Sequence, residues 1–326
     1  MSNIKDYSSP IIITGGAGFI GSNLVKSLND KGIFDIYIVD DLNSHFKKSY
    51  LEKLIYIKYF DKKDFRKLLQ NKQLPKAESI IHLGACSDTT EYNMQYLLDN
   101  NVAYSKDIFK YCLDSGIKFI YASSAAVYGD GVNGYNENVT KLWPLNPYAK
   151  SKYLFDEWVI KKSHKPSTCV GLRFFNVYGP NEFHKGKMAS MVFQAFNQVN
   201  DNGAIRLFKS YNKKYADGAQ QRDFIYVCDV VDVIEFFLKQ KNSTGIFNVG
   251  SGKARSFNDL AKALFKSMQK DENIQYIAMP KSLIAKYQYF TQADLDHLRS
   301  AGYKGSFTTI EEGIRKYVQE YLQKTP

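Results

Sequence analysis

The sequence of 326 residues contains only four cysteines, and none of them forms a CxxC pair. Cys86, Cys112, Cys169 and Cys228 lie far apart along the chain. This spacing argues against a zinc site and against a disulfide framework, both of which need clustered cysteines. We therefore expect reduced, structural thiols and no metal site.

Long apolar runs are also missing. No uninterrupted stretch approaches the roughly 18 residues that a membrane span requires. The N-terminus lacks the basic and then apolar segments of a secretion signal. We expect a cytoplasmic protein with no membrane partner.

Acidic residues are fewer than basic ones, with 33 aspartates and glutamates against 44 lysines and arginines, and the formal net charge is +11. Such an excess is typical of nucleic-acid-binding proteins. The lysines are nevertheless spread along the chain, and no nucleic-acid motif accompanies them. We expect no nucleic-acid partner, and the charge is explained either by a lysine-rich surface or by attraction of an anionic small substrate.

The most informative segment is a glycine-rich stretch that follows a short apolar run. Residues 11–13 are all isoleucine and predict a strand that is buried on both faces. Three glycines follow at three-residue steps, namely Gly15, Gly18 and Gly21, and a helical pattern begins at Phe19. Glycines at this spacing allow a tight turn, close approach of a pyrophosphate and close packing of helix on strand. The segment therefore predicts a dinucleotide-binding loop.

An acid follows where such a loop requires one. Asp40 lies 19 positions after Gly21 and can bind the adenosine ribose hydroxyls. An acid at this place favours NAD over NADP. Lys47 and Lys62 come soon after, however, and either ammonium could meet a 2′-phosphate. The residues alone leave the choice between NAD and NADP open.

Strand and helix patterns alternate along the chain. Short apolar runs at residues 35–41, 56–60, 79–83, 118–122, 169–173, 223–227 and 245–250 predict strands, and helical patterns lie between most of them. Helices are also expected at 188–199, 256–268 and 309–322, and a polar loop at 209–222. We expect an α/β fold, with a Rossmann-type doubly wound parallel sheet and a smaller mixed α/β substrate-binding domain. The NADP-binding Rossmann domain is expected at 1–176, with 223–250 returning to it, and the substrate-binding domain mainly at 177–222 and 251–326.

A tyrosine and a lysine with catalytic spacing follow the dinucleotide loop. Tyr148 and Lys152 are four positions apart at the start of a predicted helix, so their side chains share one face. Ser124 follows the strand expected at 118–122. A tyrosine that acts near neutral pH needs its pKa of about 10 lowered by roughly three units, and a nearby ammonium favours the phenolate. A chance YxxxK pair and a turn-capping serine are the alternatives, but the joint occurrence of the three residues favours catalysis.

These motifs resemble those of the extended short-chain dehydrogenase/reductase family, and the resemblance runs from the glycine loop to the end of the chain. Within that family, several segments resemble the ADP-L-glycero-D-manno-heptose 6-epimerases: residues 14–23, 84–91, 121–126, 173–180, 184–190 and 290–295. The glycine loop and the YxxxK pair occur in many sugar-nucleotide enzymes. Residues 85–91 (ACS-x-TTE) and 184–190 (HKG-x-MAS) are much more discriminating.

The resemblance implies one NADP per subunit. The implied cofactor-binding residues are Gly15, Gly18, Phe19, Ile20, Gly21, Asp40, Asp41, Lys47, Lys62, Leu83, Gly84, Ala85, Cys86, Ser87, Asn100, Lys152, Val177 and Lys185. The implied substrate-binding residues are Ser124, Asn176, Lys187, Gln194, Phe208, Lys209, Ser210, Tyr211, Arg222 and Tyr287. Tyr148 and Lys185 would be the two acid/base groups, with Lys152 and Ser124 assisting, although Lys185 could instead bind phosphate.

The implied activity is inversion of carbon 6 of the heptose in ADP-D-glycero-D-manno-heptose, by transient oxidation to a ketone and re-reduction. The product would supply heptose for the lipopolysaccharide core, and the resemblance implies a homopentamer. A UDP-hexose 4-epimerase of the same family is the alternative activity. A 4,6-dehydratase is disfavoured because Ala125 and Ala126 stand where such enzymes carry Asp-Glu. A non-catalytic dinucleotide sensor would not need Ser124, Tyr148 and Lys152 together.

Overall fold

The computed structural model describes residues 10–139, 141–284 and 287–324. Seven strands form the large sheet: β1 (Ile11–Thr14), β2 (Ile36–Asp40), β3 (Lys58–Asp61), β4 (Ser79–His82), β5 (Lys118–Ser124), β6 (Cys169–Phe174) and β10 (Thr244–Val249). They pair in parallel in the order β10-β6-β5-β4-β1-β2-β3. The chain order reverses at β1, between β2 and β4, which places a binding crevice at the carboxyl ends of these strands. The predicted doubly wound parallel sheet is confirmed.

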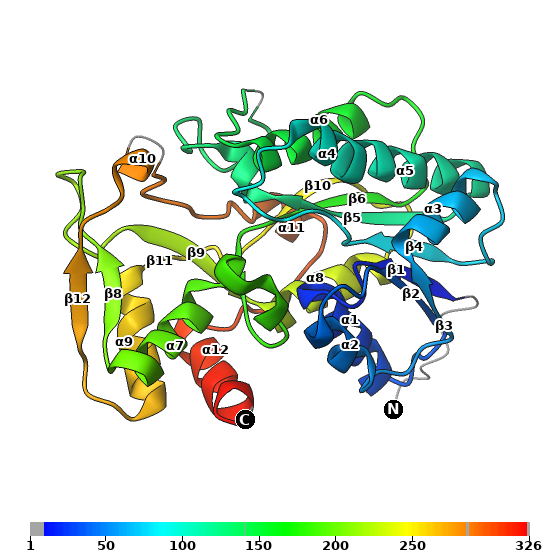
Figure 1. The fold of residues 1–326 in the computed structure, drawn as a ribbon. Coiled ribbons are helices and arrows are strands. Elements are labelled where there is room, and N and C mark those ends of the chain that lie inside the picture. The colour runs from blue at the N-terminus through cyan, green and yellow to red at the C-terminus, as the bar shows by residue number, and fades with distance from the viewer. Residues whose placement is uncertain (1–9, 140, 285–286, 325–326) are drawn as a thin grey trace.

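Helices cover both faces of this sheet (Figure 1). One face carries α3 (Lys62–Gln70), α4 (Met94–Leu97), α5 (Tyr104–Ser115) and α6 (Pro147–Ile160), and the other carries α1 (Phe19–Asp30), α2 (His45–Leu51) and α8 (Val227–Lys239). Side chains of β1 alternate between the two sides. Ile11 and Ile13 belong to the core that contains Leu24 of α1, whereas Ile12 belongs to the core that contains Phe109 of α5. All three isoleucines are fully buried, as expected for a strand covered on both faces.

The smaller part of the molecule is built on two short sheets (Figure 1). In one, β9 (Gln221–Tyr226) pairs in parallel with β7 (Asn176–Tyr178) and antiparallel with β11 (Ala254–Ser256). In the other, β8 (Ile205–Phe208) pairs with β12 (Ile274–Ile277). The helices α7 (Met191–Asn202), α9 (Phe257–Met268) and α12 (Ile310–Tyr317) bury residues in a common core with these strands. The short helix α10 (Lys281–Ile284) also lies in this part, whereas α11 (Asp296–Ser300) packs against β10 and buries Leu298 in the core of the large sheet.

Several predicted boundaries were wrong in the second half of the chain. The helix expected from residue 188 begins at Met191, because Phe183–Met188 form a 3₁₀ turn and the Ser190 side chain caps α7 by accepting from Phe193 N. The loop expected at 209–222 ends earlier, since β9 begins at Gln221. The strands β7, β8, β11 and β12 were missed, because three or four residues show little periodicity.

The division into two domains stays a prediction. Within residues 223–250, α8 and β10 pack with the large sheet, as expected, but β9 pairs with β7 and β11 of the smaller part. In the described part of the chain, no helix has the length and apolar character needed to cross a bilayer.

Candidate active site

The glycine loop connects β1 to α1 at the carboxyl edge of the large sheet. Gly15 has a φ of +70°, and a Cβ at this position would lie 2.6 Å from the backbone nitrogen of Gly84. A Cβ on Gly21 would lie 2.1 Å from the carbonyl oxygen of Gly15. Gly18 is the N-cap residue of α1, and no side chain caps the first helical N–H groups. The loop therefore fits a dinucleotide, because Gly15 and Gly21 have no room for a side chain and the N-terminus of α1 is left uncapped for a pyrophosphate.

Two carboxylates and two lysines gather beyond the end of β2. Asp40 Oδ2 accepts a hydrogen bond from Ala17 N at 2.9 Å, which ties the acid to the glycine loop. Lys47 Nζ lies 2.8 Å from Asp40 Oδ1 and 3.0 Å from Asp41 Oδ1, and Lys62 Nζ lies 2.8 Å from Asp41 Oδ2. Burial alone would raise the pKa of Asp41, but hydrogen bonds from both lysines lower it. Acceptors and cations are both available here for the ribose end of a dinucleotide.

An unpredicted asparagine holds the segment that follows β4. Between α4 and α5 the helix contains a π-helical turn, Leu98–Ala103, a feature often found at functional sites. Asn101 Oδ1 accepts from Cys86 N at 2.9 Å, while its amide nitrogen donates to Cys86 O at 2.9 Å and to Ser151 Oγ at 3.0 Å. Asn101 thus connects Cys86 to α6. An asparagine inside a predicted helix gave no signal of this role.

The start of α6 places Tyr148 and Lys152 beside the end of β5. Asn146 caps the helix by accepting from Ala149 N at 2.8 Å. Tyr148 is 9% exposed and Lys152 is 8% exposed. Lys152 Nζ donates to Ala122 O at 2.9 Å. Ser124 is the last residue of β5, and its Oγ accepts from Ala126 N at 3.2 Å, so it does cap a turn as well as facing Tyr148.

Burial sets the proton affinities of this pair. It raises the pKa of Tyr148, although the hydrogen bond with Ser124 acts in the opposite direction. Burial also lowers the pKa of Lys152 to about 8, against the charge of Asp156. At neutral pH Lys152 is therefore mostly an ammonium and Tyr148 a neutral phenol. Further positive charge near Tyr148 would favour its phenolate.

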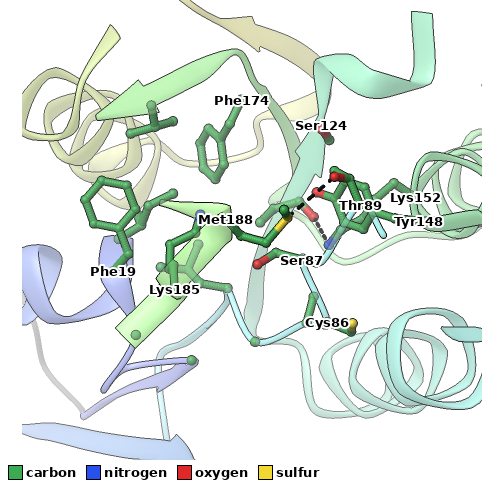
Figure 2. A pocket seen from close by; sticks show the side chains of 18 of the residues that line it. Phe19, Cys86, Ser87, Thr89, Ser124, Tyr148, Lys152, Phe174, Lys185 and Met188 are labelled. Atoms are coloured by element: carbon green, nitrogen blue, oxygen red, sulfur yellow. Dashed lines mark hydrogen bonds between the residues drawn. The ribbon is translucent and has the colours of Figure 1, made fainter. Parts of the chain in front are cut away.

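A second amine approaches from the other side of the site. Lys185 lies in the 3₁₀ turn Phe183–Met188, and its Nζ is 5.5 Å from the centre of the Phe19 ring. No carboxylate of the described residues forms an ion pair with Lys185. Burial lowers the pKa of Lys185, and the charge of Glu182 opposes this effect. In Figure 2, Lys185 lies near Phe19, whereas Tyr148, Lys152 and Ser124 lie on the other side of the pocket.

One cavity of about 650 Å³ connects these groups, a size typical of ligand-binding sites. All the predicted cofactor-binding residues and all four predicted catalytic residues line it, as do Asn176 and Lys187. The remaining predicted substrate-binding residues do not: Gln194, Phe208, Lys209, Ser210, Tyr211, Arg222 and Tyr287. Gln194 instead supports the Lys185 segment, because its amide nitrogen donates to Ala189 O at 2.8 Å.

The two discriminating sequence segments meet inside this cavity. Thr89 Oγ1 donates to Met188 Sδ at 3.5 Å, and Figure 2 shows Met188 between Lys185 and Thr89. Both residues line the cavity, yet neither was predicted as a site residue. Their membership of the segments 85–91 and 184–190 was the signal that could have identified them.

Arg222 and its aromatic neighbours form a second cluster next to the cavity. The Arg222 guanidinium lies 5.6 Å from the ring of Phe257, which lines the cavity, and 5.2 Å from the ring of Tyr287. It is 8% exposed, and no carboxylate of the described residues pairs with it. A buried cation that lacks an acidic partner suits an anionic ligand.

Comparisons with known proteins agree with this geometry. Residues 11–250 match the model of the NAD dependent epimerase/dehydratase family. The ADP-L-glycero-D-manno-heptose-6-epimerase of Fusobacterium nucleatum is 47% identical, covering 96% of this chain and 98% of its own length. The enzyme of the same name from Brachyspira hyodysenteriae is also 47% identical, over 97% of this chain and 98% of its own.

A solved structure extends the similarity to three dimensions. The crystal structure of Helicobacter pylori ADP-L-glycero-D-manno-heptose-6-epimerase superposes with a TM-score of 0.81, at 29% identity and over 98% of each chain. The chain belongs to the NAD dependent epimerase/dehydratase family and, within it, to the ADP-L-glycero-D-manno-heptose-6-epimerases.

Proposed function

We propose that the protein inverts carbon 6 of the heptose in ADP-D-glycero-D-manno-heptose, giving ADP-L-glycero-D-manno-heptose for the lipopolysaccharide core. The observation that carries the proposal is the placement of two proton-handling groups, Tyr148 and Lys185, on different walls of one cavity beside the glycine loop. Inversion through a planar ketone requires attack on either face of one carbon. Two such groups can serve the carbonyl oxygen in its two orientations.

The cofactor is proposed to lie along the carboxyl edge of the large sheet. The N-terminus of α1 would hold its pyrophosphate, the cluster of Asp40, Asp41, Lys47 and Lys62 its adenosine ribose, and Lys152 its nicotinamide ribose. When bound there, the nicotinamide supplies transient oxidation of carbon 6 and its re-reduction. We propose NADP, because two ammonium groups would face a 2′-phosphate.

Substitution of Lys47 by alanine tests the choice of dinucleotide. Removing one charge-assisted hydrogen bond to a phosphate is expected to raise the Kd for NADP about 10-fold or more, with a smaller change for NAD. Titration of cofactor-free protein with each dinucleotide measures both values. Lys48 is adjacent and exposed, so Lys48→Ala is the matched control. An equal loss for NADP and NAD would show that Lys47 does not recognise the 2′ position.

Tyr148 is proposed to take the proton of the 6-hydroxyl and to return a proton to the same oxygen. Ser124 would donate a hydrogen bond to that oxygen and keep it in line with the phenol. Lys152 supplies positive charge that favours the phenolate. Lys185 would exchange the proton when the carbonyl oxygen points to the other wall. Burial lowers the pKa of Lys185, which brings the amine closer to the range in which it can both give and accept a proton.

The ADP part of the substrate is proposed to extend toward Arg222. Its guanidinium would bind the diphosphate, and the rings around Tyr287 would contact the adenine. Phe208 and Tyr289 lie 6.3 and 5.2 Å from Tyr287 between ring centres, and the Tyr289 hydroxyl accepts from Tyr211 N at 3.0 Å. These contacts join Phe208 and Tyr211 to the cluster around Tyr287 and support their proposed role in substrate binding.

Replacing Arg222 by methionine is therefore expected to raise KM for the ADP-sugar about 10- to 100-fold, the range that a charged hydrogen bond provides. Initial rates over a range of substrate concentrations give KM and kcat separately. Arg206 is exposed and lies outside both clusters, so Arg206→Met is the control. An unchanged KM would exclude Arg222 from the diphosphate site.

The function itself is tested by incubating the purified protein with a panel of nucleotide sugars. We expect a new epimer from ADP-D-glycero-D-manno-heptose and none from UDP-glucose or dTDP-glucose. Conversion of UDP-glucose would favour the 4-epimerase alternative. Dehydration remains disfavoured, because Ala125 and Ala126 have no group that can expel a hydroxyl. Turnover of none of these sugars, with dinucleotide bound, would favour a sensor.

The assembly is proposed to be a homopentamer in the cytoplasm. One chain has a mass of 37.3 kDa, so light scattering of the purified protein in solution should give five times that value. The mass of one or two chains would contradict the pentamer and leave the proposed reaction unaffected, since each cavity is formed within one chain.

A further inference from the structure

One buried carboxylate joins the two ends of the segment that carries Lys185. Glu182 is fully buried, and its side chain accepts three hydrogen bonds. Oε1 accepts from Gly179 N at 3.3 Å and from Ser190 Oγ at 2.8 Å, and Oε2 accepts from Ser190 N. Gly179 precedes the segment and Ser190 follows it, so these contacts close residues 179–190 into a loop.

Contacts from other elements also hold the middle of this loop. The turn Phe183–Met188 contains no buried residue. Gly186 has a φ of +51°, and a Cβ there would meet no atom within 4 Å. Glycine is therefore favoured here because of the positive φ and not because neighbouring atoms leave no room for a side chain. The ring of Phe183 does pack against Phe193 of α7, at 5.1 Å between centres. The Gln194 amide also donates to Lys187 O at 3.2 Å and to Ala189 O at 2.8 Å, and Thr89 donates to Met188 Sδ. The position of Lys185 therefore depends on these contacts and on how the ends of the loop are held.

The surroundings of Glu182 suit an ionised carboxylate. Both oxygens are occupied by donors, two of them backbone N–H groups. Burial raises the pKa of Glu182, and the hydrogen bonds from Ser190 and Gly179 oppose that rise. The same charge acts on Lys185, where it favours the ammonium against the effect of burial. Glu182 therefore has two effects on the loop: it binds the backbone N–H groups of Gly179 and Ser190, and its charge favours the ammonium form of Lys185.

We propose that Glu182 is a positioning residue, whose carboxylate holds the 179–190 loop closed so that Lys185 reaches the cavity beside Phe19. The role rests on the proposed function of Lys185 as an acid/base group. Glu182 itself does not line the cavity and acts only through the loop.

Glu182→Gln tests the proposal with little change in size. The amide replaces one acceptor oxygen by a donor, so at least one of the three present donors loses its partner. A displacement of about 1 Å in a reacting group costs on the order of 10²-fold in rate. We expect kcat to fall by about that factor, with KM changed less than about threefold and with cofactor content retained. Glu272 is exposed, and Glu272→Gln is the control.

The Lys185→Met background separates positioning from general damage to the fold. If Glu182 acts through Lys185, adding Glu182→Gln to Lys185→Met should lower kcat no further. A drop by the same factor in both backgrounds would overturn the positioning role. Should Lys185→Met itself keep normal turnover, the proposed function of Lys185 fails, whatever Glu182 does.

Hydrogen exchange gives a readout that does not depend on activity. The Gly179 and Ser190 amides both donate to Glu182, so Glu182→Gln should speed the exchange of at least one of them while amides of the large sheet keep their protection. Unchanged exchange at both amides would overturn the proposal. If Glu182→Gln fails to fold, Ser190→Ala keeps the backbone bond to Oε2 and removes the hydroxyl bond to Oε1 together with the cap on Phe193 N, and a smaller fall in kcat is then expected. Unchanged kcat in that variant would also count against the proposal.

Discussion

Replacement of Tyr148 by phenylalanine should reduce kcat about 10²- to 10⁴-fold, the range for loss of a positioned acid/base group. The phenol oxygen is the atom that exchanges the proton, and phenylalanine keeps the ring that fills this buried site. KM and cofactor content should remain close to those of the unaltered protein. Steady-state rates of epimer formation, together with the nucleotide content of each preparation, measure these quantities.

Tyr153 provides the matched control for this substitution. It lies on the same helix, and its hydroxyl contacts Glu157 at 3.2 Å, away from the cavity. Tyr153→Phe should leave the rate unchanged. Near-normal turnover in Tyr148→Phe would remove Tyr148 from the proposed chemistry.

Lys185→Met should have an effect of similar size, with kcat falling about 10²-fold or more in both directions of the reaction. Both directions pass through the same two orientations of the ketone, so loss of either proton-handling group slows them equally. Methionine keeps much of the length of lysine and its contact with Phe19. Rates are measured from each epimer separately, and the exposed Lys253→Met is the control.

The alternative role of Lys185 gives a different pattern. A lysine that only bound phosphate would raise KM for the substrate or weaken cofactor binding, and kcat at saturation would be little changed. That result would leave Tyr148 as the single proton-handling group and would contradict inversion by two opposed groups.

The fold could be predicted from sequence because its strongest signals are local. The isoleucine run before Gly15 and the glycine spacing after it depend on contacts within one strand-turn-helix unit. The same holds for the cap and helix that present Tyr148 and Lys152. Short strands such as β8 and β12 could not be predicted, because their pairing joins segments far apart in the chain.

The site was predictable only in part, for a similar reason. The glycine loop itself and Asp40, which contacts it at Ala17 N, belonged to a recognisable motif. Asn101 and Glu182, by contrast, have their effect through backbone atoms of other segments, and residue type alone does not show which backbone group a side chain will reach. Arg222 was predicted by resemblance, but its lack of an acidic partner became evident only in three dimensions.

The most direct test is to incubate the purified protein with ADP-D-glycero-D-manno-heptose in deuterated water and to follow carbon 6 by NMR. We expect both epimers to appear, each retaining its original hydrogen on that carbon, because the hydrogen is removed and returned within one closed site. Deuterium on carbon 6 would instead show exchange with solvent during inversion and would contradict the proposed mechanism.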